Sequence, residues 1–202
     1  MPMNNEKIRS RTMSAFNTYR SKVEKSFDSG AFSDGLSWYD EKRVRLRRLS
    51  ERSNVPFAST CGICAVMSPL TNWDDNFLAT DKMLKMKERP NEEIADVVSK
   101  HTTLGKSVEK ALSLLRGEKR IHQVVRGPKV RPFFYNLSGD LSRVTVDRIM
   151  WDTVGRFGLS SDTPTGNART GIISAVKMLA TLYDLKPAQI QAIVWKQVRD
   201  YS

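Results

Sequence analysis

The sequence predicts an all-α protein of about nine helices, arranged in one or two lobes. Apolar residues recur at three- and four-residue intervals along most of the chain, which is the period of an amphipathic helix. The only strand-like triplet, Val144-Thr145-Val146, is too short to found a sheet. With 202 residues, 40% of them hydrophobic, the chain can bury a core. We expect an N-terminal helical arm over residues 1–35 and the main helical domain over residues 36–202.

The two helices expected first are both basic. The first covers residues 4–28, where apolar side chains such as Phe16 and Val23 recur between Lys and Arg. A Ser33-Asp34-Gly35 connection leads into the second, over residues 36–53, which is the most basic segment of the chain. Its arginines are Arg43, Arg45, Arg47, Arg48 and Arg52. Pro56 ends this helix because proline disfavours helical geometry in the residue before it.

Residues 57–68 are almost entirely apolar and predict a buried helix, capped by Ser59 or Thr60. Pro69 breaks it. The other helices are expected over residues 71–87, 91–100, 103–116, 147–157, 168–183 and 187–201. The caps expected for the helix at 103–116 are Thr102, Thr103 or Ser107.

The charge of the chain favours a polyanionic partner. The formal net charge is +11 and the sequence pI is about 9.8, so nucleic acid is the first partner to consider and an anionic membrane surface the second. The aromatic residues are not interleaved with the basic ones as in a single-strand stacking platform. No apolar run is long enough to span a membrane, and residues 1–11 lack the apolar core of a signal peptide. We expect a cytoplasmic protein, in the host cytoplasm if a phage encodes it.

The two cysteines predict neither a redox site nor a metal site. Cys61 and Cys64 have the spacing of a redox motif, but a thioredoxin-like site would need a βαβ setting. A zinc site would need two more ligands. We expect two buried helix cysteines, no metal and no cofactor.

Residues 126–148 contain two short motifs at a defined separation. Gly127-Pro128-Lys129-Val130 resembles the second half of the hairpin in the helix-hairpin-helix DNA glycosylases. The segment 144–148 (VTVDR) resembles the part of that superfamily that carries the catalytic aspartate. Lys129 and Asp147 are 18 residues apart, close to the spacing in the superfamily. The resemblance covers residues 57–160 and includes residues 62–84, which resemble the early helix of these enzymes.

A closer resemblance is to small proteins of phages and mobile elements. They share Trp38-Tyr39, the pattern S-P-x-T-x-W-x-x-N over residues 68–76, V-T-V-D, and an ending like that of residues 187–195. This likeness spans residues 36–199. It implies a helix-hairpin-helix, glycosylase-like fold for the main domain.

The resemblance also implies an activity and a set of site residues. The protein would bind double-stranded DNA and act as a hydrolase on a flipped base, by N-glycosidic cleavage or related base chemistry. Asp147 would stabilise positive charge on the sugar or activate a water, and the amine of Lys129 would attack the sugar. The expected DNA contacts are Arg126, Gly127, Arg131, Arg43 and Arg47. The expected pocket residues are Ser68, Thr71, Trp73 and Asn76.

Several departures from the pattern keep other interpretations open. Val125 replaces the first glycine of the hairpin, and Pro132 favours a helix that starts near Arg131-Pro132 and leaves Lys129 in a loop. Asp147 also fits a helix cap, and Trp73 also fits a plain core position. The alternatives are a non-catalytic nucleic-acid-binding module that retains the fold, and a phage adaptor or inhibitor of a host protein.

Overall fold

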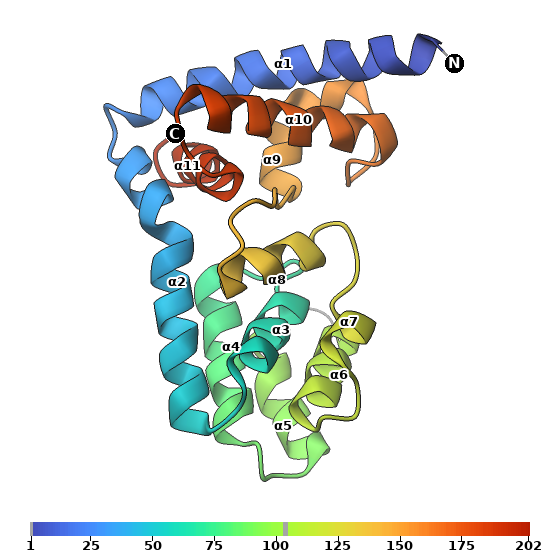
Figure 1. The fold of residues 1–202 in the computed structure, drawn as a ribbon. Helices are drawn as coiled ribbons and strands as arrows, with labels where there is room; N and C mark the ends of the chain where they lie inside the picture. The colour runs from blue at the N-terminus through green and yellow to red at the C-terminus, as the bar shows by residue number, and fades with distance from the viewer. Residues whose placement is uncertain (1, 103–104) are drawn as a thin grey trace. The chain divides into compact units, whose positions relative to one another are not determined.

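The computed structural model describes residues 2–102 and 105–202, and in these ranges the protein is all-α (Figure 1). The described residues form eleven α-helices and one 3-10 helix and contain no strand, which confirms the predicted all-α class. The helices are α1 (Pro2–Ser26), α2 (Ala31–Ser53), α3 (Phe57–Met67), α4 (Trp73–Lys85), α5 (Asn91–Ser99), α6 (Gly105–Leu115), α7 (Ile121–Val124), α8 (Val130–Ser138), α9 (Arg148–Thr153), η1 (Gly155–Gly158), α10 (Gly166–Leu182) and α11 (Pro187–Arg199).

The chain forms two compact units. The first combines residues 1–40 with residues 140–202, and the second consists of residues 41–139. Helix α2 contributes its first residues to one unit and the remainder to the other. The boundary expected at residue 35 therefore lies inside a helix.

The first unit is built on α1, α9, α10 and α11. Helix α1 packs along α10 and α11, and α9 packs against α11. Tyr19 of α1 and Trp151 of α9 are fully buried, together with Ile172 and Leu179 of α10. Because burying apolar surface is the main driving force of folding, these side chains hold the two ends of the chain in one core.

Helix α2 begins earlier than the sequence indicated. Residues 33–35 were expected to connect two helices, but they lie in the first turns of α2. A Cβ added to Gly35 would lie 2.4 Å from the Cα of Ile193 in α11. Gly35 is thus the residue that lets the backbones of two helices approach closely, and not a turn residue.

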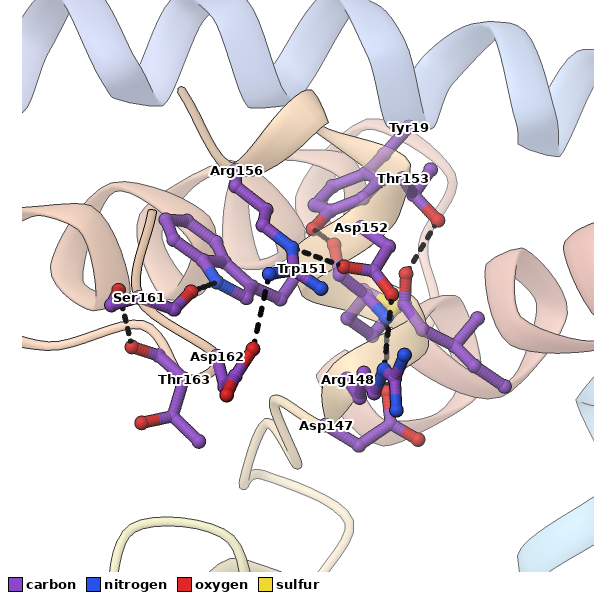
Figure 2. Close-up of polar contacts among 12 residues, drawn as sticks. Tyr19, Asp147, Arg148, Trp151, Asp152, Thr153, Arg156, Ser161, Asp162 and Thr163 are labelled. Atoms are coloured by element: carbon purple, nitrogen blue, oxygen red, sulfur yellow. Dashed lines mark hydrogen bonds and ion pairs between the residues drawn. The ribbon is translucent and has the colours of Figure 1, made fainter. Parts of the chain in front are cut away.

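The helix expected over residues 147–157 is interrupted. Helix α9 ends at Thr153, and the next turn runs through left-handed backbone, with φ of +53° at Arg156 and +49° at Phe157. This conformation is unfavourable for residues with a Cβ, so side-chain contacts must maintain it. Arg156 forms ion pairs of 2.6 Å with Asp152 and 3.2 Å with Asp162, as Figure 2 shows.

The second unit surrounds a buried helix. All eight residues from 60 to 67 in α3 are buried, and α3 packs against α4, α6, α7 and α8. This confirms the buried helix predicted over residues 57–68. The expected cap is wrong: Pro56 occupies the N-cap position, without a side-chain hydrogen bond, and Thr60 is inside the helix.

The other helices of this unit lie close to their predicted positions. The α4 helix starts at Trp73, and the side chain of its N-cap, Asn72, accepts a hydrogen bond of 2.9 Å from the Asp75 amide. The α6 helix is described from Gly105, and Thr103, an expected cap, lies outside the described residues. Helix α7 was not expected, because four residues are too few to produce a periodic pattern.

Within residues 2–102 and 105–202, no helix combines the length and the apolar character needed to cross a membrane.

Candidate nucleic-acid interface

A pocket of about 540 Å³ lies on the second unit, where α7, the following turn and α8 meet. It is lined by Ile121, His122, Val125, Arg126, Gly127, Arg131, Phe134 and Tyr135. Two arginines, a histidine and two aromatic rings therefore share one concavity. Among the described residues, no carboxylate lines it.

The spacing along α8 explains why one side of this helix is buried and another faces the pocket. Residues three and four apart lie on the same face of a helix, so Arg131, Phe134 and Tyr135 are neighbours. The guanidinium carbon of Arg131 lies 5.9 Å from the centre of the Tyr135 ring. The Phe134 and Tyr135 rings meet edge to face, with their centroids 5.3 Å apart. Phe133, Asn136 and Leu137 of the same helix are buried.

The turn before α8 depends on a glycine. Gly127 has a φ of +93°, a conformation that residues with a Cβ rarely adopt. Its carbonyl oxygen accepts a hydrogen bond of 3.2 Å from the Arg131 amide, and the Arg126 Nε donates to the His122 carbonyl at 3.3 Å. The turn therefore holds the backbone of Arg131, and the bond to His122 holds the side chain of Arg126.

Pro132 is compatible with α8 because of its position. The helix begins at Val130, one residue before the expected start near Arg131-Pro132, so Lys129 precedes the helix and Pro132 is its third residue. The amides of the first turn have no partner within a helix, and the missing N–H of proline costs little there. The next amide, that of Phe133, donates to the Lys129 carbonyl at 3.2 Å. The Gly-Pro-Lys sequence thus leads directly into a helix.

A smaller pocket of about 370 Å³ shares Arg126 with the first. Lys106 and Lys110 of α6 line it, together with Ser107 and apolar side chains that include Val66 and Val124. Again no carboxylate from the described part of the chain lines the pocket. The two pockets form a cationic surface that extends to both sides of Arg126, which we call the α6–α8 surface.

Lys129 lies next to this surface but lines neither pocket. It occupies the N-cap position of α8, and its Nζ donates to the Ser68 carbonyl at 3.1 Å. The lysine therefore links the start of α8 to the end of α3.

The two α2 arginines predicted to contact DNA belong to the second unit but not to its pockets. The guanidinium carbon of Arg47 lies 4.4 Å from the centre of the Phe57 ring. The Arg43 guanidinium lies beside Gly139, where an added Cβ would be 2.9 Å from its Nη1. Arg47 is exposed and Arg43 is half-buried.

The four residues predicted to line a base pocket lie at the end of α3, in the α3–α4 connection and in α4. The Ser68 hydroxyl donates to the Ala65 carbonyl at 2.8 Å, and the Thr71 hydroxyl donates to the Pro69 carbonyl at 3.2 Å. Trp73 and Asn76 are buried, with 8% and 1% of their surface exposed. The Asn76 side-chain amide donates to the Cys64 carbonyl at 3.0 Å. None of the four lines either pocket described above.

Asp147 belongs to the first unit, where it caps α9 (Figure 2). Its Oδ1 accepts a hydrogen bond of 2.9 Å from the Met150 amide. The Tyr19 hydroxyl donates to the Met150 carbonyl at 2.7 Å, and burial, followed by the charge of Asp147, raises the pKa of Tyr19. Lys129 and Asp147, predicted as partners in catalysis, thus belong to different compact units.

The cysteines lie inside the second unit. Both are free and buried, and burial raises the pKa of Cys61 and of Cys64 to about 12. A protonated, inaccessible thiol is a poor nucleophile and a poor metal ligand. In the described ranges, no three His, Cys, Asp or Glu side chains are grouped in a way that could hold a metal ion.

Part of the α6–α8 surface could be predicted from the sequence. Arg126, Gly127 and Arg131 were expected contacts, and the structure brings them together. Phe134, Tyr135 and the two α6 lysines were not expected. The i, i+3 and i+4 spacing of the α8 residues was the available signal.

These features define an all-α protein in which one compact unit carries a cationic pocket with an aromatic wall. The chain belongs to a family of unknown function, DUF7178, whose model matches residues 4–202. No curated protein and no solved structure matches the chain.

Proposed function

We propose that this protein binds nucleic acid through the α6–α8 surface. The observation that carries the proposal is the grouping of Arg126 and Arg131 with two aromatic rings in one pocket that no described carboxylate lines. Phosphate groups bind guanidinium groups through charge-assisted hydrogen bonds, and nucleic-acid bases stack on aromatic rings.

The charge of the second unit supports this proposal. Residues 41–139 contain 19 Lys and Arg against 11 Asp and Glu, so this unit holds +8 of the net +11. Within the described residues, neither Arg126 nor Arg131 forms an ion pair. A polyanion could therefore approach both without displacing a carboxylate. Binding would be driven largely by release of counterions and would weaken as salt increases.

The test measures how affinity depends on salt, by fluorescence anisotropy of a labelled oligonucleotide at about 50 to 200 mM salt. Arg126→Ala and Arg131→Ala should each lower the affinity and reduce the slope of log K against log salt by about 1. Arg89→Ala is the matched control, because Arg89 is an exposed arginine of the same unit that lines neither pocket. Equal losses in all three variants would show that binding depends on net charge and not on this surface.

Base chemistry on DNA is a second candidate function, supported by the order of local features. Gly127-Pro128-Lys129 forms a turn directly before α8, and Asp147 directly precedes α9. The resemblance to helix-hairpin-helix glycosylases implies the same order, a Gly-Pro-Lys turn before one helix and an aspartate before the next. In this proposal, the fold is glycosylase-like, and Asp147 assists departure of a base from its sugar. Lys129 would then serve as the amine nucleophile or as a phosphate contact.

Base release from damaged and modified DNA tests this second function, with wild type compared to Asp147→Asn. Asparagine retains an oxygen that can cap α9, so the variant should fold while losing the carboxylate. Base release by wild type that Asp147→Asn abolishes would support the chemistry. Equal release by both proteins, or none from any substrate, would count against it.

A further inference from the structure

We propose that the pocket between α7 and α8 holds one unstacked nucleotide, so that the protein prefers single-stranded over double-stranded nucleic acid. The base would lie against Phe134 and Tyr135, and its phosphate would lie between Arg126 and Arg131. The inference rests on the proposed function and specifies the form of nucleic acid that is bound.

The size and lining of the pocket fit one nucleotide. Its volume of about 540 Å³ lies in the range of pockets that hold small organic ligands. Ile121, Val125 and the two aromatic rings provide apolar surface, while Arg126, Arg131 and His122 provide polar groups. A nucleotide likewise has an apolar part, the flat face of its base, and a charged part, its phosphate.

The aromatic residues and the arginines lie where one nucleotide can reach both. Arg131, Phe134 and Tyr135 share a face of α8. Arg126 is held by the hydrogen bond from its Nε to the His122 carbonyl, which leaves its two Nη groups for a phosphate. Gly127 lies between the two arginines in sequence and, having no side chain, leaves the approach to the turn open: an added Cβ would meet no atom within 4 Å.

The two aromatic rings, Phe134 and Tyr135, favour a single strand over a duplex. In a duplex, each base is already stacked on its neighbours, and its faces are not available to a protein ring. In a single strand, a base can leave its neighbours and stack on Phe134 at much smaller cost. A surface that contacts only the duplex backbone needs cationic groups but no aromatic rings.

The second pocket provides a place for the adjoining part of the strand. It shares Arg126 with the first pocket and adds Lys106 and Lys110. A strand whose base enters the first pocket could therefore place a neighbouring phosphate in the second. Such a groove, with cations along the backbone and a ring for a base, is typical of proteins that bind single strands without sequence preference.

The test compares a labelled single strand of about 16 nucleotides, lacking self-complementarity, with the blunt duplex of the same sequence. Wild type should bind the single strand about fivefold more tightly or better at the same salt concentration. Phe134→Leu should lower single-strand affinity by about fivefold or more and leave duplex affinity nearly unchanged. Phe134→Tyr keeps a ring of the same shape and should restore single-strand affinity.

Phe77→Leu is the control, because Phe77 is a half-buried aromatic residue of the same unit that lines neither pocket. It should bind both probes as wild type does. Equal affinity for the two probes, or a Phe134→Leu variant that binds the single strand like wild type, overturns the nucleotide pocket. In that case, the proposed function stands if Arg126→Ala still weakens binding. Failure of wild type to bind either probe overturns both proposals.

Discussion

Replacing Asp147 by alanine should destabilise the first unit through the N-terminus of α9. The Asp147 side chain caps this helix with a hydrogen bond of 2.9 Å to the Met150 amide. Losing an N-cap side chain costs about 1 kcal/mol, within a range of about 0.5–2 kcal/mol. The Met150 side chain is fully buried, and an amide left without a partner in such surroundings raises the cost. We expect the free energy of unfolding to fall by about 1.5–2 kcal/mol in Asp147→Ala.

Asp147→Asn provides the comparison because asparagine is about as good an N-cap as aspartate. Its free energy of unfolding should lie within about 0.5 kcal/mol of wild type. Urea unfolding followed by far-UV circular dichroism measures both variants, with the slope against urea used to check that the denatured states are comparable. Equal loss of stability in Asp147→Ala and Asp147→Asn would refute the cap as the source of the effect. A stable Asp147→Ala variant would refute the hydrogen bond itself as a contributor.

Two further predictions concern buried positions. Gly35→Ala should lower the free energy of unfolding by about 2 kcal/mol or more, because the added Cβ would collide with the Ile193 backbone. Gly105→Ala is the control and should be neutral or stabilising, because its added Cβ meets no atom within 4 Å. Thermal and urea unfolding measure both variants, and a stabilised Gly35→Ala would contradict the close helix contact. Cys61 and Cys64 should resist a thiol reagent at about pH 8 in the native protein, because burial raises the pKa of each to about 12. Both should react when the protein is unfolded. Stoichiometric reaction of the native protein at the rate of a free thiol would contradict this prediction.

Local patterns in the sequence predicted the helices well where the pattern was strong. The all-α class and the buried helix α3 follow from residues that are neighbours along the chain, and the structure confirms both. The cap at Asp147 was one of two interpretations of the V-T-V-D motif, and the geometry of α9 supports it. A cap depends on contacts within four residues, so the sequence contains the necessary information.

The role of Gly35 depends on a contact between distant segments of the chain, which no local pattern contains. Gly35 was expected in a connection because glycine is common in turns, but its role is to let α2 approach α11 closely at Ile193, far away in sequence. Helix α9 stops short at Gly155, whose φ of +58° is the left-handed conformation that commonly ends a helix, so this end was a local signal within the segment expected to be helical.

The sequence by itself determined that this protein is helical and strongly basic and that residues 126–131 contain cations around a glycine turn. Only the tertiary structure decided which cations act together and what lies beside them. Packing of α7 and α8 on α3 brought Arg126 to the α8 face that carries Arg131 and the two rings, and packing of α6 on α3 added Lys106 and Lys110 to a pocket that shares Arg126. The reason is physical: helical periodicity depends on neighbours three and four residues apart, whereas a binding surface depends on how separate helices bury their apolar faces against one another.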